Sequence, residues 1–169
     1  FGEVIAELVD GVSKLSDIKF SSRREKQAEN FMKMFLSVAK DLRVIIIKFA
    51  DRLHNMSTIS HLSLIKQRRI AVETKDVYAP LAHRLGMNKL KVELEDLVLK
   101  TLEPDEYKIL KKKTQASRKQ REKYIDEFTN PIKSELQPFN IKADIFGRVK
   151  HYYSILGKMR NQNKKYEEL

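Results

Sequence analysis

The stretch DLRVIIIKFADRLHNMSTI, residues 41–59, combines a helical spacing of apolar residues with an abrupt change to polar ones. Apolar residues recur at steps of three and four from Ile45 through Phe49 to Met56, which is the pattern of a helix with one buried side. The rest of the chain agrees, because only five glycines and four prolines interrupt its 169 residues. We therefore expect a mainly α-helical fold.

The composition bounds the class of protein. With 41% hydrophobic and 34% charged residues, the chain can bury one core of fair size or two small ones. The longest uninterrupted apolar run, Val44 to Ile47, is too short for a membrane span, and the start of the chain lacks the basic region of a signal peptide. The absence of cysteine excludes disulfides, thiol nucleophiles and thiolate metal sites. We expect a cytoplasmic protein with no membrane partner.

The net charge of +11 indicates an acidic partner, for which nucleic acid, a phosphorylated small molecule and an anionic membrane surface are the candidates. Much of the excess charge lies in KILKKKTQASRKQREKY, residues 108–124. The solvated face of a long helix is the favoured interpretation of this run, and contact with nucleic acid is the alternative.

Helical segments follow one another along most of the chain. The predicted helices cover residues 1–15, about 24–55, 63–80, 88–102, a long basic segment that begins at Pro104 and stops near Pro131 or Pro138, and 151–159. The length of the helix over 24–55 indicates a break, which the spacing does not locate. Pro80 should end or kink the third helix, and Gly86 is a plausible helix stop. The segment NIKADIFGRV, residues 140–149, alternates apolar and polar residues as a strand does. The expected fold class is therefore mainly α, followed by the first strand and helix of an α/β nucleotidyltransferase-like domain.

Three polar residues share one side of the helix in the opening stretch. At about 100° per residue, Asp51, Asn55 and Thr58 fall within a narrow sector. Val44 and Ile47 lie on the same side one to two turns earlier. We therefore expect the first part of this side to be buried and the polar groups to lie at the edge of a core. A carboxylate there could bind a hard or borderline cation, and the amide and hydroxyl could bind a substrate or water.

A purely structural interpretation of these residues stays open. In it, Asp51 pairs with Arg52 or Arg84, and Asn55 caps the end of the helix. His54, three residues after Asp51, invites a metal interpretation, but a lone histidine more often packs with one ring nitrogen hydrogen-bonded. From helix geometry alone, the structural interpretation is the favoured one, and a ligand site is the alternative.

The acids Glu93, Glu95 and Asp96 resemble a paired-carboxylate site. Lysines flank them on the same predicted helix, and residues three or four apart on a helix are close enough to form ion pairs. We therefore expect these acids to be ion-paired at the helix surface rather than to carry out acid–base chemistry.

Four motifs in a fixed order connect the chain to a known family. They are DGVSKL at 10–15, ADRLHNM at 50–56, YAPLAHRLGM at 78–87 and FGRVKHYYSILGKM at 146–159. In this order and spacing they resemble the Rel/SpoT family of bifunctional enzymes, which make and degrade the alarmone (p)ppGpp in the stringent response. One such motif would be a weak signal, whereas four in order span nearly the whole chain.

The resemblance implies three parts. Residues 1–100 would be the C-terminal portion of a helical HD-type (p)ppGpp hydrolase domain, residues 101–134 a helical connector, and residues 135–169 the start of the synthetase domain. The implied parent is a guanosine 3′,5′-bis(diphosphate) 3′-pyrophosphohydrolase that is also a GTP pyrophosphokinase.

In the hydrolase half, the resemblance implies a site that holds Mn²⁺ through an upstream His, a His-Asp pair and the aspartate of ADRLHNM, which here is Asp51. Asn55 and Thr58 match positions that contact the nucleotide, and Lys14 lies in a segment expected to line the same pocket. The implied reaction is metal-assisted attack of water on the 3′-pyrophosphate, which releases pyrophosphate and GDP or GTP. The family's HD and Glu-Asp pairs precede the first motif, so we expect no hydrolysis by this chain alone.

In the synthetase half, the family's GRVKxxxSIxxK segment binds the ATP that donates pyrophosphate to GTP or GDP. Arg148, Lys150, Ser154 and Lys158 fit that pattern. Guanidinium and ammonium groups suit the charge of a triphosphate, although a solvated basic face is the favoured interpretation when the family is left aside. The acids that hold Mg²⁺ are expected after the last residue, so synthesis by this chain alone is not expected either.

The implied partners are guanine nucleotides (ppGpp, GTP and GDP) and ATP, and any contact with the ribosome would involve regions outside this chain. Two alternatives stay open. One is a basic helical module that binds nucleic acid with an affinity that falls steeply with salt. The other is a parent protein in which the hydrolase domain has degenerated and only synthesis survives. No feature of the sequence selects an oligomeric state.

Overall fold

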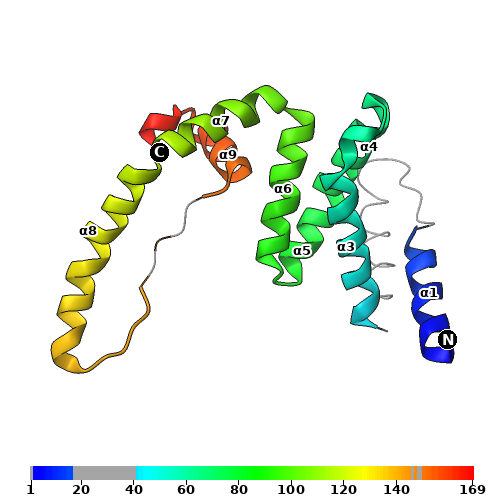
Figure 1. Ribbon diagram of the computed structural model, residues 1–169, viewed down its shortest axis with the longest axis horizontal. Coiled ribbons are helices and arrows are strands. Elements are labelled where there is room, and N and C mark those ends of the chain that lie inside the picture. Colours follow the sequence, from blue (N-terminus) through cyan, green and yellow to red (C-terminus); the bar gives the residue numbers. More distant parts are fainter. Residues whose placement is uncertain (1, 17–40, 146, 148–149) are drawn as a thin grey trace. The chain divides into compact units, whose positions relative to one another are not determined.

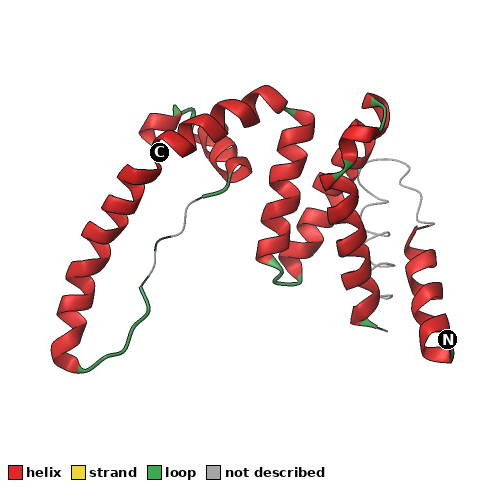
Figure 2. Cartoon of the chain, in the orientation of Figure 1, coloured by secondary structure: helices red, strands yellow, loops and turns green. Residues whose placement is uncertain are grey.

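The computed structural model describes residues 2–16, 41–145, 147 and 150–169. The chain falls into two compact units, Phe1–Leu102 and Glu103–Leu169. Every regular element in the described residues is helical, which confirms the expected mainly α fold (Figures 1 and 2). Within this part of the chain, no helix meets the length and hydropathy of a membrane span.

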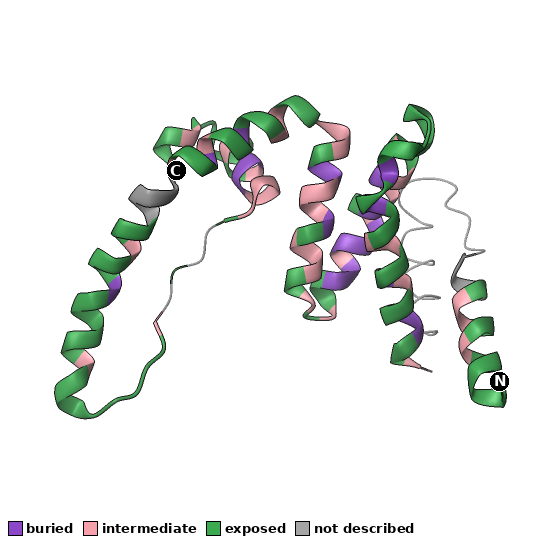
Figure 3. Ribbon diagram, in the orientation of Figure 1, coloured by how far each residue is buried: buried purple, intermediate pink, exposed green. Residues whose placement is uncertain are grey.

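The first unit is a set of helices around one core. Its described elements are α1 (Glu3–Ser16), α3 (Leu42–Ser57), the 3₁₀ turn η1 (Ile59–His61), α4 (Leu64–Glu73), the π-helical segment η2 (Thr74–Tyr78), α5 (Ala79–Arg84) and α6 (Asn88–Leu102). Buried residues from α3 through α6 meet in this core (Figure 3). Ile45, Phe49 and Met56 of α3 are among its fully buried members, so the apolar spacing in the opening stretch marks the packed side as predicted.

Helix α3 begins later than the helix predicted over residues 24–55. Asp41 has an extended backbone, with φ −154° and ψ 114°, and its side chain accepts a hydrogen bond from the Arg43 amide at 2.8 Å. Asp41 is therefore an N-cap, and α3 begins directly after it. Residues 24–40 lie outside the described residues. The apolar spacing did not locate this helix start, because an aspartate fits both the polar side of a helix and its N-cap.

Of the two outcomes predicted for Pro80, an end or a kink of the third helix, the end is wrong. Helix α4 continues through η2 into α5, and the helical course reaches Arg84. The Ala79 amide donates to the Thr74 carbonyl, five residues back, which is the hydrogen bond of a π turn. A π turn relieves the clash that a proline ring makes with the carbonyl four residues earlier in an α-helix.

Gly86 stops α5 as predicted. Its φ of +74° is in the left-handed region, which favours glycine. The Gly86 amide donates to the His83 carbonyl at 3.1 Å, and the Met87 amide donates to the Ala82 carbonyl at 2.9 Å. This pair of hydrogen bonds is a Schellman motif. Helix α6 starts immediately afterwards and covers the residues predicted for it, 88–102.

The second unit contains α7 (Pro104–Ala116), α8 (Arg118–Leu136), the 3₁₀ turn η3 (Gln137–Phe139), α9 (Tyr152–Gln162) and the 3₁₀ turn η4 (Tyr166–Glu168). Pro104 lies in the first turn of α7, where its missing amide hydrogen has no helical partner to lose. The predicted long basic helix is divided at Ser117. Helix α8 passes through Pro131 and ends at Leu136, so Pro138 marks its boundary.

Helices α7 and α9 pack together in this second unit. The rings of Tyr107 and Tyr152 meet edge to face with centroids 5.2 Å apart, and Arg160 pairs with Glu103. These contacts tie α9 to the start of α7, although 44 or more residues separate the partners along the chain. The helical spacing predicted for residues 151–159 is therefore confirmed, and α9 has a packed side.

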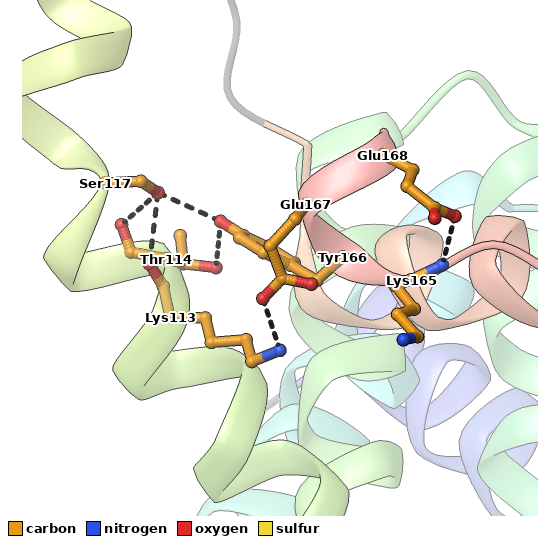
Figure 4. A network of polar contacts seen from close by, with 7 residues as sticks. All are labelled: Lys113, Thr114, Ser117, Lys165, Tyr166, Glu167 and Glu168. Atoms are coloured by element: carbon orange, nitrogen blue, oxygen red, sulfur yellow. Dashed lines mark hydrogen bonds and ion pairs between the residues drawn. The ribbon is translucent and has the colours of Figure 1, made fainter.

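The last turn of the chain is held against α7 by polar contacts (Figure 4). The Tyr166 hydroxyl lies 3.0 Å from the Ser117 hydroxyl and donates to the Thr114 hydroxyl at 3.4 Å. Lys113 donates to Glu167 at 2.7 Å. Ser117, at the division between α7 and α8, is therefore a contact point for the chain that follows α9.

The predicted strand over residues 140–149 stays a prediction. Residues 141–145 have no regular secondary structure, and residues 146, 148 and 149 lie outside the described residues. A strand forms only by hydrogen bonding to a neighbouring strand, and the described part of the chain provides none.

Candidate functional site

Asp51 and Asn55 lie together on the exposed side of α3. The Asn55 amide nitrogen donates to Asp51 Oδ1 at 3.1 Å, and both residues are exposed. Phe49 and Met56, on another side of the same helix, are buried in the core and fix how α3 presents this pair. The helix geometry therefore brings Asp51 and Asn55 together as predicted.

Thr58 terminates α3 rather than joining the pair by a hydrogen bond. It is the C-cap residue, its hydroxyl and its amide each donate to the His54 carbonyl at 3.0 Å, and it is exposed. Because it is C-cap to the same helix, its side chain comes one turn after Asn55. The helix therefore presents a carboxylate, an amide and a hydroxyl in succession along its last two turns.

Lys14 lies in α1, and the side chain of this residue is outside the described part of the chain. Helix α1 packs against α3. Gly11 makes the contact close, because a Cβ added there would lie 2.9 Å from Val44 Cγ2. We did not predict this contact from the sequence, although the glycine inside DGVSKL is a signal for it. The contact brings the helix that carries Lys14 next to α3.

Two of the structural alternatives weighed for these residues are wrong, whereas a pair between Asp51 and Arg84 stays a prediction. Arg52 pairs with Glu73 of α4 rather than with Asp51, and Thr58 rather than Asn55 caps the helix. The first part of this side of α3 was expected to be buried. The expectation is confirmed for Val44, which is buried, and wrong for Ile47, which is 43% exposed. Val44 is covered by α1, and that cover does not extend to Ile47.

Asp51 fits the role of a single metal ligand. Its carboxylate is exposed, and a hydrogen bond from Asn55 orients it, as hydrogen-bonded neighbours commonly orient metal ligands. In residues 2–16, 41–145, 147 and 150–169, no group of three or more His, Cys, Asp or Glu side chains could hold an ion. The described residues therefore do not form a complete metal site by themselves.

Of the three acids predicted to be ion-paired on α6, Glu95 is confirmed, and the ion pairs of Glu93 and Asp96 stay predictions. Lys91 Nζ lies 3.3 Å from Glu95 Oε2, one helical turn away. Burial raises the pKa of Glu95, because the charged carboxylate is less well solvated in the partly buried site, and the ion pair with Lys91 lowers it by a smaller amount. The contact is a surface ion pair at the edge of the core and not an acid–base dyad.

The raised pKa of Glu95 predicts a pH dependence of stability. Because the folded chain holds this proton more tightly than the unfolded chain, protonation favours folding. The unfolding free energy of the wild type, minus that of Glu95→Gln, should therefore increase as the pH falls through the raised pKa of the folded state toward 4.5, the ordinary value for glutamate, and level off below it. Urea unfolding of both proteins across this range, with exposed Glu93→Gln as the control on the same helix, measures it. A difference that stays constant with pH would contradict the prediction.

The predicted ATP-binding residues are partly described. Arg148 lies outside the described residues, whereas Lys150 and Lys158 are exposed and Ser154 is half-buried in the first turn of α9. The Lys158 side chain lies within hydrogen-bonding reach of Lys150 and, with smaller effects of burial and of its charge, lowers the pKa of Lys150. Two amines held close together form a strongly positive spot, which suits a phosphate group.

Comparison with known proteins bears on both sets of residues. A family model described as HD domain matches residues 1–88, which is half of the chain. The chain belongs to the HD domain family. The matched residues include Lys14, Asp51, Asn55 and Thr58, so the candidate hydrolase residues all lie in the HD portion.

Curated relatives match over the full chain or nearly so. A GTP pyrophosphokinase of Myxococcus xanthus is 48% identical over 172 residues, covering 100% of this chain and 23% of the relative. A probable guanosine-3′,5′-bis(diphosphate) 3′-pyrophosphohydrolase of Synechocystis is 51% identical over 170 residues, covering 100% and 22%. The bifunctional (p)ppGpp synthase/hydrolase SpoT of Escherichia coli K12 is 48% identical over 159 residues, covering 94% and 23%.

These names confirm the resemblance to the Rel/SpoT family that the four motifs indicated. The chain spans under a quarter of the length of each of these three relatives. The relatives' names include both a hydrolase and a pyrophosphokinase, which is the pair of activities expected from the motifs.

Proposed function

We propose that this chain is the segment of a bifunctional (p)ppGpp enzyme that joins the end of the hydrolase domain to the start of the synthetase domain. The observation that carries this proposal is the Asp51–Asn55 pair, an exposed carboxylate and amide at 3.1 Å on a helix whose other side is fixed in the core. Relatives with hydrolase and pyrophosphokinase names support both activities.

In the proposed hydrolase, Asp51 supplies one ligand of a Mn²⁺ ion, and Asn55 and Thr58 contact the ppGpp nucleotide. Lys14, on the neighbouring helix α1, lines the same pocket. The ion would supply Lewis-acid chemistry and an activated water to the 3′-pyrophosphate. What the described residues contribute is the orientation of the carboxylate, through the hydrogen bond from Asn55.

In the proposed synthetase, Lys150 and Lys158 neutralise the triphosphate of ATP, with Arg148 and Ser154 as further contacts. The close pair of amines supports this assignment, because its mutual repulsion would be relieved by an anion. Mg²⁺ would be held by acids outside the described residues, and GTP or GDP would accept the pyrophosphate. We further propose a cytoplasmic location for the whole enzyme.

The proposed domain division is residues 1–100 for the hydrolase portion, 101–134 for the connector and 135–169 for the synthetase portion. The change of compact unit between Leu102 and Glu103 supports the first boundary. Contacts between α7 and α9 support a connector that packs directly on the synthetase portion.

Binding to nucleic acid is the competing proposal, favoured by the run of exposed lysines on α7, which includes Lys108, Lys111 and Lys112. It predicts an affinity that falls steeply with salt and requires neither a metal ion nor a guanine nucleotide. A filter-binding titration with RNA at several salt concentrations distinguishes it.

The experiment that tests the proposed function is an assay of pyrophosphate release from ppGpp by the full-length protein, with and without Mn²⁺, beside the 169-residue chain alone. We expect Mn²⁺-dependent release by the full-length protein and none by the chain alone, since the chain's described residues do not form a complete metal site by themselves. If the full-length protein releases no pyrophosphate but transfers it from ATP to GTP, the hydrolase proposal fails and a synthetase-only enzyme remains.

A further inference from the structure

Arg52 follows Asp51 on α3 and makes its contacts with α4 and η2 instead of with the candidate site. We propose that Arg52 is a positioning residue, which holds Asp51 and Asn55 in place through Glu73 and Tyr78. The inference rests on the proposed role of Asp51 and Asn55 in the hydrolase, and it assigns a role to residues that do not themselves contact the nucleotide.

The first contact is a forked ion pair between helices. Arg52 Nη2 donates to Glu73 Oε1 at 2.9 Å, and Arg52 Nη1 donates to Glu73 Oε2 at 3.2 Å. The side chains are only 12% and 24% exposed. A two-point hydrogen-bonded fork restricts the orientation of the guanidinium as well as its distance, which a single contact would not do.

The second contact packs the guanidinium of Arg52 against the ring of Tyr78. The guanidinium carbon of Arg52 lies 4.0 Å from the centroid of the Tyr78 ring, which is buried. The Tyr78 ring in turn meets Phe49 edge to face, with centroids 6.4 Å apart. Arg52 is therefore held against a ring that is itself fixed in the core. Because Arg52 is part of α3, this contact also restrains the backbone of the helix.

The π-helical segment explains how both partners reach one guanidinium. Glu73 is the last residue of α4, and Tyr78, five residues later, is the last residue of η2. In a π turn the hydrogen bonds join residues five apart, so residues at that spacing come to lie above one another. A continuous α-helix would separate Glu73 and Tyr78 by about 140° around its axis, at 3.6 residues per turn.

A purely stabilising role does not account for Arg52. Its Nε is buried without a hydrogen-bond partner among the described atoms, which is unfavourable for folding. Buried ion pairs are often matched or exceeded in stability by apolar residues of similar volume. The forked contact therefore supplies orientation at least as much as it supplies stability.

The orientation matters because Asp51 lies on the same helix, one residue away. A rotation of α3 by about 20° would carry a carboxylate about 6 Å from the helix axis through about 2 Å. A displacement of about 1 Å at a reacting site can lower a rate by about 100-fold. Fixing α3 against rotation is thus a requirement for a site that depends on Asp51 and Asn55.

The test uses two conservative variants of the full-length protein. Arg52→Lys keeps the positive charge but loses the fork, and Glu73→Gln keeps the size of its side chain but loses the charge. We expect each to lower kcat for ppGpp by about 10- to 100-fold, the usual range for residues that orient metal ligands. We also expect weaker Mn²⁺ binding, measured without nucleotide by electron paramagnetic resonance, under conditions in which urea unfolding shows that each variant is folded.

Arg43→Lys is the matched control. Arg43 lies on the same helix and makes a similar fork with Asp41, but it is exposed, so kcat and Mn²⁺ affinity should stay at wild-type values.

If Arg52→Lys also keeps both values, or loses activity only in proportion to the unfolded fraction, the positioning role is overturned. If the wild type binds Mn²⁺ without hydrolysing ppGpp, the proposed function fails, and weaker Mn²⁺ binding by Arg52→Lys still supports positioning. If the wild type neither binds Mn²⁺ nor hydrolyses ppGpp, both proposals are overturned.

Discussion

The Asp51→Ala variant of the full-length protein is expected to hydrolyse ppGpp at least about 100-fold more slowly than the wild type. Loss of a residue that merely orients a metal ligand commonly costs about 10- to 100-fold, and Asp51 is proposed as a ligand itself. The variant also leaves the Asn55 amide without the acceptor that it has at 3.1 Å. Initial rates of Mn²⁺-dependent pyrophosphate release from ppGpp measure the effect.

Two controls separate this loss of chemistry from a loss of folding. Asp105→Ala removes an exposed acid from the first turn of α7 and should retain the wild-type rate. Transfer of pyrophosphate from ATP to GTP should survive in the Asp51→Ala protein, because Asp51 has no proposed role in synthesis. Retention of hydrolysis by Asp51→Ala would show that this carboxylate is structural, and the assignment of the metal site to α3 would be wrong.

The Leu94→Ala variant is expected to lose about 2–5 kcal/mol of unfolding free energy, the range for truncating a buried leucine. Leu94 is fully buried in α6, a helix that packs against α3, α4 and α5. Truncation leaves a cavity where these helices meet, in addition to removing apolar surface from the core. Urea unfolding followed by circular dichroism measures the change.

Leu64→Ala is the control for Leu94→Ala, because it makes the same chemical change at the start of α4, where the residue is 81% exposed. A surface substitution of this kind should change the unfolding free energy by no more than about 0.5 kcal/mol. Equal effects of the two variants would mean that α6 is not packed in the core as described.

Much of the helical order follows from local sequence signals. The spacing of Ile45, Phe49 and Met56 predicts the buried side of α3, and these residues are buried. Gly86 predicts the end of α5, because its left-handed backbone conformation is unfavourable for other residues. These features depend on residues a few positions apart, so the sequence carries them without knowledge of the fold.

At two places, the start of α3 and Pro80, a local signal had more than one outcome, so the spacing of apolar residues alone did not select the structure. Asp41 is an N-cap inside a continuous apolar pattern, and aspartate also occurs on the polar side of helices, so its presence does not mark a helix start. Pro80 is accommodated by a π turn instead of ending the helix. Whether a proline ends a helix or is absorbed by it depends on whether the helices on both sides are packed, and here α4 and α5 both contribute to the core.

The sequence by itself determined the helical class, the family and the placement of Asp51 and Asn55 on one side of α3, because periodicity and motif order are one-dimensional properties. Only the tertiary structure decided that Arg52 pairs with Glu73, 21 residues later, and not with the adjacent Asp51. It also decided that Gly11 lets α1 approach Val44. Such partners are selected by the packing of helices that are distant along the chain. Several acids could pair with Arg52, and the packing of α3 against its neighbours decides which acid lies within reach.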